Sequence, residues 1–272
     1  MRLTTKLLIL LLPLLSTCAI AGGNAGTCEA PNTPLHVITS GGFAAAHQLL
    51  TPQFTAKHGI DIQTSFGSSS GGAPDSIPER LKRGEQFDVL ILSRSSLDKL
   101  TEAGFTIPNS RTNLVRSLIG MAVKQGAEKP DISNEQAFIN QLLQAESIGF
   151  SASASGTYLS TVLWPQMGIW EQIRHKSRRI ESERVASVVA RGEVEIGFQQ
   201  ISEILPIEGA EFAGAIPNEL QKTTIFSAAI TQKSQNVTAA ECLLEFLSSV
   251  EASDTIRSVG LTPISESRAS HD

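Results

Sequence analysis

The chain has 272 residues, of which 41% are hydrophobic and 18% are charged, so it can bury a sizeable core and does not have the composition of a disordered protein. Its 22 basic and 27 acidic residues give a formal net charge of −5. Nucleic acid is excluded as an expected partner, because polyphosphate binding needs a basic face that this balance does not indicate.

Residues 1–21 have the layout of a secretory signal peptide. Two positive charges precede the short apolar run LLILLLPLL, and small residues before position 22 offer a cleavage site. The apolar run is too short to span a bilayer stably, and no later segment reaches about 18 uninterrupted apolar residues. We therefore expect cleavage after Ala21 and export to the periplasm. Lipidation at Cys18 is the alternative, although Thr17 is a poor match to the residue that precedes a lipidated cysteine.

The first 80 residues after this segment alternate between strand and helix patterns. Strands are predicted at 35–40, 61–66 and 88–93, and helices at 44–59, near 75–84 and at 96–104. Strict alternation of this kind favours a parallel sheet covered by helices, with the loops at the carboxyl ends of the strands available for a ligand.

The pattern then resets and predicts a second unit of similar size. Its strands are expected at 117–126, 147–151 and 194–200, and its helices include 134–145 and 183–193. A further long strand at 223–232 and two helical segments follow. The simplest topology has two doubly wound α/β domains, residues 34–115 with 225–272 and residues 116–224. Two hinge crossings join them around a cleft.

The spacing of the cysteines and histidines does not indicate a metal site or a thiol nucleophile. Cys28 and Cys242 remain after cleavage, and spacing alone cannot decide between a disulfide and two thiols. No pair of histidines sits at i, i+4 beside a carboxylate, so we expect no metal site. The chain has no phosphate-binding loop, no GxSxG and no pairing that indicates a thiol nucleophile, and we expect no cofactor.

Three turns combine small hydroxyl side chains with glycine. TSGGFA (39–44), SFGSSSGG (65–72) and SASASGTY (151–158) each follow a predicted strand and lie at or near a helix start. Backbone N–H groups are unsatisfied at such positions, and serine adds neutral donors. Each turn alone is explained by helix capping, but three of them on both sides of a cleft predict an anion site.

The order of these turns and of RLKRGEQFDVLILS and ARGEVEIGFQQISE resembles the periplasmic molybdate-binding family of ABC-type solute-binding proteins, over nearly all of the mature chain. The resemblance implies a periplasmic-binding-protein-like fold and an anion held by neutral donors. By match, the donors are Ser40, Ser69 or Ser70, and Ser155. The full set of candidate ligand-binding residues is Ser40, Gly41, Gly42, Ser69, Ser70, Arg80, Ser153, Ser155, Tyr158, Arg191, Gln199 and Gln200.

The chain departs from the oxyanion binders at Gln199 and Gln200, where that family has a tyrosine close to an aspartate. The segments IGMAVKQGAEKPDIS, VVARGEVEIGFQQISE and LQKTTIFSAAI are more similar to a subgroup that includes aconitate isomerases, which interconvert trans- and cis-aconitate. This resemblance implies a cofactor-free isomerase, expected to be a monomer. The alternatives are a non-catalytic protein that delivers a polycarboxylate or oxyanion to a membrane transporter, and an exported sensor domain.

A tricarboxylate site needs positive charge as well as serine donors. Arg80, Arg83, Arg191 and Lys222 are the candidates, and each has the alternative role of a solvated charge at a helix end.

An allylic isomerisation also needs a base and an acid. The candidates are His47, Asp75, Glu79 and Tyr158, each of which also has an ordinary structural role, and the sequence does not choose among them.

Overall fold

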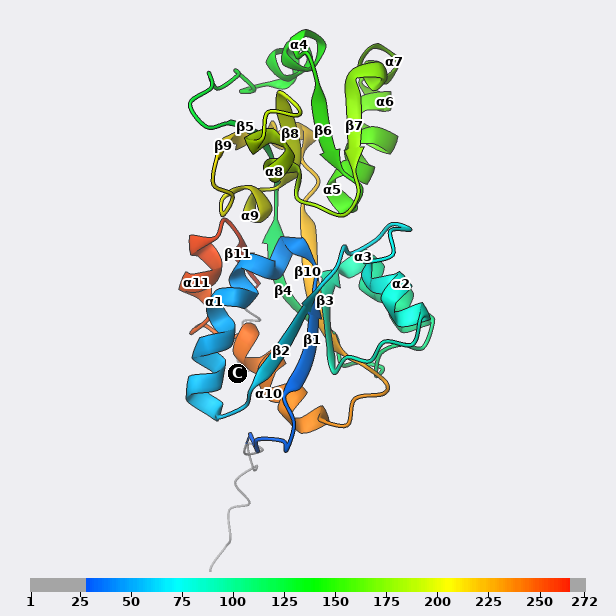
Figure 1. Ribbon diagram of the computed structural model, residues 1–272, viewed down its shortest axis with the longest axis vertical. Helices are drawn as coiled ribbons and strands as arrows, with labels where there is room; N and C mark the ends of the chain where they lie inside the picture. Colours follow the sequence, from blue (N-terminus) through cyan, green and yellow to red (C-terminus); the bar gives the residue numbers. More distant parts are fainter. Residues whose placement is uncertain (1–27, 265–272) are drawn as a thin grey trace, which may run out of the picture.

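The computed structural model describes residues 28–264, so the predicted signal peptide and Cys18 lie outside the described residues. Two β-sheets stand one above the other in Figure 1. The strands of the first sheet, in spatial order, are β11 (Thr262–Pro263), β4 (Thr112–Ser117), β10 (Thr224–Ile230), β3 (Val89–Ser93), β1 (Leu35–Thr39) and β2 (Ile62–Phe66). Those of the second are β7 (Ser177–Ile180), β6 (Ile148–Ser151), β8 (Ile196–Gln200), β5 (Ile119–Lys124) and β9 (Ala210–Ala215).

Helices cover both faces of each sheet. On the first sheet, α1 (Gly41–His58), α10 (Val237–Leu247) and α11 (Ser253–Ser258) share one apolar core, and α2 (Ile77–Lys82) and α3 (Arg94–Glu102) share the other. On the second sheet, one face packs against α4 (Glu135–Gln144) and the helical run made of α5 (Ala154–Tyr158), a π-helical turn (Leu159–Leu163), α6 (Trp164–Gln166) and α7 (Trp170–Ile173). The other face packs against α8 (Val185–Ala190) and α9 (Ile201–Ile204). Short 3₁₀ turns lie at Arg174–Lys176 and Asn218–Leu220.

The first sheet is mixed, and the expectation of a parallel sheet is correct only for part of it. Strands β1, β2 and β3 are parallel, whereas β10 runs antiparallel to both β3 and β4. The reason is that β10 returns from the second sheet and enters the first from the opposite end.

The strand predicted at 117–126 is β5, and it is preceded by β4, which the sequence analysis did not predict. Strand β4 ends at Ser117 in the first sheet and β5 begins at Ile119 in the second, so Leu118 alone joins them. The return passage runs from β9 to β10 and lies beside the passage from β4 to β5. Gln221 links the two passages, because its side chain accepts from Ile119 N at 3.1 Å and donates to Ile119 O at 2.7 Å and to Ile216 O at 3.2 Å.

A disulfide joins Cys28 to Cys242 of α10, with the sulfur atoms 2.16 Å apart and the Cα atoms 5.9 Å apart. This resolves the alternative that the sequence left open. Between residues 28 and 264, no helix combines the length and apolar character needed to cross a bilayer.

Candidate functional site

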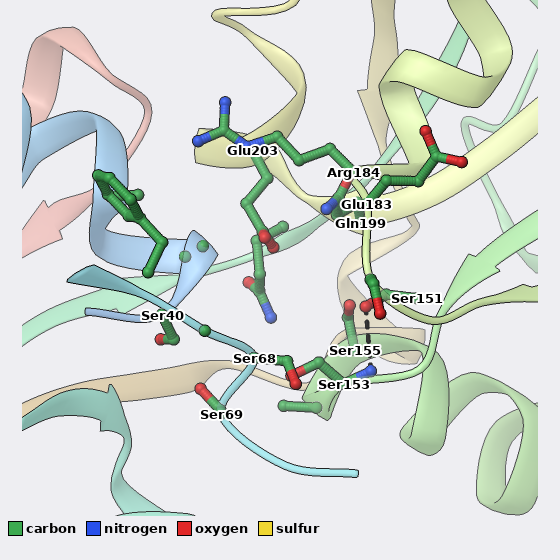
Figure 2. A pocket seen from close by; sticks show the side chains of 18 of the residues that line it. Ser40, Ser68, Ser69, Ser151, Ser153, Ser155, Glu183, Arg184, Gln199 and Glu203 are labelled. Carbon is green, nitrogen blue, oxygen red and sulfur yellow. Dashed lines mark hydrogen bonds between the residues drawn. The ribbon is translucent and has the colours of Figure 1, made fainter. Parts of the chain in front are cut away.

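A cavity of about 190 Å³ lies between the two sheets (Figure 2). Its walls come from the carboxyl ends of β1 and β2 in the first sheet and of β6, β7 and β8 in the second, with α9 completing the wall. Loops at the carboxyl ends of parallel strands are where ligands bind in α/β proteins. The predicted site residues on its surface are Ser40, Gly41, Gly42, Ser69, Asp75, Ser153, Ser155, Gln199 and Gln200.

Ser40 presents an unused donor at the start of α1. It occupies the N-cap position, but its side chain makes no capping hydrogen bond, and its Oγ has no partner among residues 28–264 although the residue is only 1% exposed. Buried hydroxyl groups are normally hydrogen-bonded, so this one indicates a ligand. A Cβ at Gly42 would overlap the Phe226 ring, so glycine is required for this close approach.

The turn after β2 offers a second donor. Ser69 is buried, and its Oγ accepts a hydrogen bond from Ser93 N at 3.0 Å, which leaves its O–H free to donate. Ser68 also lines the cavity, but its hydroxyl donates to Ser70 O at 2.9 Å. The hydroxyl of Ser69 is therefore better placed than that of Ser68 to bind a ligand.

The turn after β6 is held in shape by its own contacts. Ser151 Oγ accepts from Ser153 N at 3.0 Å, the bond drawn as a dashed line in Figure 2. A Cβ at Gly156 would overlap the carbonyl group of Ser151, so only glycine allows this tight return. Ser155, which is 2% exposed, lies on the cavity side of the turn.

The paired glutamines at the end of β8 are buried against the cavity. Gln199 Oε1 accepts from Ala186 N at 3.3 Å, and Gln200 Nε2 donates to Thr224 Oγ1 at 3.1 Å. Gln200 Oε1 has no partner among the residues that the structure describes. These amides supply neutral polar groups where the oxyanion binders were expected to have a tyrosine.

Arg184 is the cation on the cavity surface, and it precedes α8 at the N-cap position. Within residues 28–264 it forms no ion pair with a carboxylate. The nearby acids Glu181 and Glu183 are paired with Arg179 at 3.5 Å and with Arg191 at 2.9 Å. The guanidinium of Arg184 is thus left available for a planar anionic group.

Asp75 lines the cavity and connects its two sides. Its Oδ1 accepts from Ser182 Oγ at 3.1 Å, which joins the segment before α2 to the segment after β7.

Glu203, on α9, is an acid that the sequence analysis did not select. Its side chain points into the cavity from α9, which packs against the start of α1 (Figure 2). Desolvation by the surrounding protein raises the pKa of the carboxyl group to about 7, although Arg184, the Gln199 side chain and the Gln200 backbone act in the opposite direction. Around neutral pH this group is therefore present in both protonation states.

His47 does not reach the cavity. It is 1% exposed on α1, and its Nε2 lies 2.9 Å from Thr64 Oγ1 on β2. Burial lowers the pKa of His47 to about 4, so the ring is neutral at pH 7 and packs between helix and strand.

Four other predicted residues also lie away from the cavity, because nearby residues of opposite charge are their partners. Arg80 donates to Glu85 at 2.8 Å and to Phe66 O at 3.0 Å. Glu79 pairs with Lys82 at 2.7 Å, one turn along α2. Arg191 is held by Glu183 and by Glu193, and these contacts raise its pKa. Arg83 likewise pairs with Glu85 at 2.9 Å.

Ser70, Tyr158 and Lys222 line a different cavity of about 640 Å³. The Tyr158 hydroxyl donates to Leu220 O at 3.1 Å, and burial raises its pKa. Lys222 Nζ lies 5.2 Å from the centre of the Tyr158 ring. Tyr158 therefore contacts the return passage and does not line the cavity that contains Ser40 and Ser155.

The residues that sequence reasoning missed are Ser68, Ser151, Glu181, Ser182, Glu183, Arg184 and Glu203. The run ESER at 181–184 follows β7, but the sequence of β7 does not indicate a strand, so the run gave no clear signal. Glu203 gave none, because its position depends on how α9 packs against α1. No group of three or more metal-binding side chains occurs within residues 28–264.

Comparison with known proteins gives consistent similarities. A family described as bacterial extracellular solute-binding protein matches residues 35–262. The chain is 42% identical over 234 residues to an aconitate isomerase from a Pseudomonas species, covering 86% of this chain and 89% of that protein. It is 23% identical to the molybdate-binding protein ModA of Azotobacter vinelandii over 88% of this chain and 94% of that one.

The fold is also that of a solved relative. The structure of the periplasmic molybdate-binding protein of Azotobacter vinelandii superposes with a TM-score of 0.67 at 21% identity, over 84% of this chain and 98% of the other. The resemblance seen in the sequence motifs and the fold expected from it are confirmed.

Proposed function

This chain belongs to the bacterial extracellular solute-binding proteins, and from that premise we propose that it is an aconitate isomerase acting in the periplasm. The observation that carries the proposal is the 42% identity to an aconitate isomerase over 86% of the chain. Two molybdate-binding relatives are only 23% and 21% identical, so the ligand need not be molybdate.

The donors around the cavity suit a ligand with several carboxylates. The start of α1 offers backbone N–H groups together with the unused hydroxyl of Ser40, and Ser69 and Ser155 add neutral donors from the other turns. Arg184 supplies a full positive charge without a competing ion pair among the described residues. We propose that these groups bind the carboxylates of aconitate.

The same donors support the chemistry. Removing a proton from the methylene carbon of trans-aconitate places negative charge on the carbon chain and its carboxylates, and protonation at the other end of the three-carbon unit moves the double bond. Preorganised hydrogen-bond donors stabilise such a developing charge. Of the acid–base candidates that we took from the sequence, Asp75 is the one on the cavity surface.

We further propose that residues 34–115 with 225–272 and residues 116–224 form two domains that close around the ligand. The hinge is then the pair of passages held together by Gln221. The protein is proposed to be a monomer exported through its N-terminal segment.

A second function is favoured by the family itself and by the molybdate-binding relatives. In that case the chain binds a polycarboxylate or an oxyanion without turnover and delivers it to a membrane transporter. The two functions differ in whether bound aconitate is converted.

Proton NMR of the purified protein with trans-aconitate in deuterated water tests the proposal. We expect cis-aconitate to appear, and the amount of deuterium in its carbon skeleton measures how far the shifted proton exchanges with solvent before it is returned. The Ser40→Ala variant tests whether conversion takes place in this cavity, because it removes one donor without adding bulk or charge. It should slow conversion at low substrate concentration.

Absence of conversion by the wild-type protein, together with a raised melting temperature in the presence of aconitate, would instead establish the binding function. A ligand present at 100 times its dissociation constant adds about 2.7 kcal/mol of stability, which a melting experiment detects. If aconitate gives neither conversion nor stabilisation but molybdate or sulfate stabilises the protein, the site is one for an oxyanion.

A further inference from the structure

We propose that Glu203 is the carboxyl group that removes the proton from one carbon of aconitate and returns it to the other. This inference rests on the proposed isomerase function. It assigns to a single side chain on α9 the acid and base roles that the sequence left open.

The position of Glu203 is the first argument. The residue lies on α9 immediately beyond the paired glutamines of β8, and its side chain lines the cavity. A Cβ at Gly41 would overlap Glu203 Oε1, so the carboxyl group lies against the first residue of α1. Gly41 directly follows Ser40, whose unused hydroxyl marks the expected position of a ligand carboxylate. The neighbouring Ser202 holds this arrangement, because its Oγ donates to Gly42 O at 2.8 Å.

The lack of a salt bridge is the second argument. A desolvated carboxylate is normally paired with a cation, yet the half-buried Glu203 forms no ion pair within residues 28–264. Arg184 is close enough to influence it but lies beyond ion-pair distance. The other charged groups on the cavity surface are Asp75, Glu181, Glu183 and Arg184. The ionisable side chains of elements packed against α9 are His47, Lys57 and His58 of α1, Lys124 of β5 and Glu211 of β9.

The proton affinity of the Glu203 carboxyl group suits both removal and return of a proton near neutral pH. With a pKa of about 7, Glu203 is an effective base when ionised and an effective acid when protonated. Asp75, by comparison, is already engaged with Ser182 in a hydrogen bond across the cavity. Glu203 is thus the cavity acid whose surroundings best suit proton transfer.

The reaction balances with this one group. The ionised carboxylate of Glu203 takes a proton from the methylene carbon, and the electrons of that C–H bond form a new double bond to the central carbon. The electrons of the original double bond then form a C–H bond at the former vinyl carbon, using the proton held by Glu203. The carboxylate is regenerated, and no oxidant, reductant or co-reactant is consumed. A single carboxyl group requires that both transfers take place on the same face of the substrate.

The test compares Glu203→Gln with Glu208→Gln, an exposed glutamate just beyond α9 that lies outside the cavity. We expect Glu203→Gln to lower kcat for trans-aconitate at least 100-fold, in line with the usual contribution of acid–base catalysis. Its affinity for tricarballylate, the saturated analogue of aconitate, should stay within about 5-fold of wild type, because the amide removes a proton-transfer group and not a ligand donor. Glu208→Gln should match the wild type in both measurements.

Calorimetry with tricarballylate in buffers of different ionisation enthalpy adds an independent readout. An anionic ligand beside Glu203 should make the wild-type protein take up a proton at pH 7.5, and Glu203→Gln should not. If Glu203→Gln retains more than a third of the wild-type kcat, the inference is overturned while the isomerase function stands. If the wild type itself does not convert aconitate, the proposed function fails and this inference with it. If Glu203→Gln loses ligand binding, Glu203→Asp is the variant to test. An aspartate variant that binds tricarballylate and keeps the full kcat, although its carboxyl group is displaced by the shorter side chain, would contradict the proposed role of Glu203.

Discussion

Replacing Glu203 by glutamine should make the protein more stable at alkaline pH and leave its stability unchanged in acid. In the folded protein the pKa of Glu203 is raised to about 7, whereas in the unfolded chain it takes the ordinary value of 4.5. Below pH 4.5 the group is protonated in both states and has no effect. As the pH rises towards 7, only the unfolded chain ionises freely, so the folded state loses stability. Glutamine removes this loss.

The magnitude follows from the shift. A change of one pKa unit corresponds to about 1.4 kcal/mol, so burial of the ionised carboxyl group costs the folded state about 3 kcal/mol above pH 7. Glu203→Gln should therefore raise the free energy of unfolding by up to about 3 kcal/mol at pH 8 and by almost nothing at pH 4.

The effect of His47 on stability has the opposite pH dependence. Its pKa of about 4 in the folded state means that stability falls as the pH drops from 6.5 towards 4. The variant should thus be most stable at a higher pH than the wild type.

Urea unfolding of both proteins at pH 4.5, 6 and 8 measures the difference directly, and subtraction cancels the groups that the two proteins share. Glu208→Gln serves as the exposed control and should track the wild type. A Glu203→Gln variant that is destabilised at pH 8, or whose stability difference from wild type does not change with pH, would show that the carboxyl group is not desolvated as described.

Three further changes test the structure. Ser40→Ala should weaken tricarballylate binding by about 1 to 3 kcal/mol, measured by calorimetry, and unchanged affinity would contradict the assignment of its hydroxyl to the ligand. Replacing Cys28 and Cys242 by serine should lower the free energy of unfolding by about 2 to 5 kcal/mol in urea, whereas a disulfide that does not form in solution predicts no difference. Gly156→Ala should cost about 2 kcal/mol or more in a thermal melt, since its Cβ would overlap the Ser151 carbonyl group, and a neutral result would be inconsistent with that turn.

The serine turns could be predicted because they depend on local order in the chain. A small hydroxyl residue placed between a strand and a helix marks the carboxyl end of that strand, and this rule brought Ser40, Ser69 and Ser155 to one cavity. Arg80 and Arg191, which were expected near a ligand, do not line this cavity, and their positions have a local explanation as well. Glu85 and Glu193 follow within a few residues and provide their partners.

Other features depend on contacts that no local pattern encodes. The position of the Glu203 carboxyl group in the cavity depends on the packing of α9 on α1, and these elements are about 160 residues apart in the sequence. The edge strands β7 and β9 lack hydrophobic alternation, and their sequences SRRI and AEFAGA do not indicate strands. Strand β4 (Thr112–Ser117) was not predicted, and the strand expected at 117–126 corresponds to β5.

The bond between Cys28 and Cys242 also changes how cleavage of this chain would appear. It closes residues 28–242 into a covalent ring that includes both passages between the sheets. A protease that cuts once within the ring, for example in the exposed segment 124–129, leaves the two pieces tethered. Such nicked molecules would migrate as intact protein on a non-reducing gel and separate into fragments only after reduction.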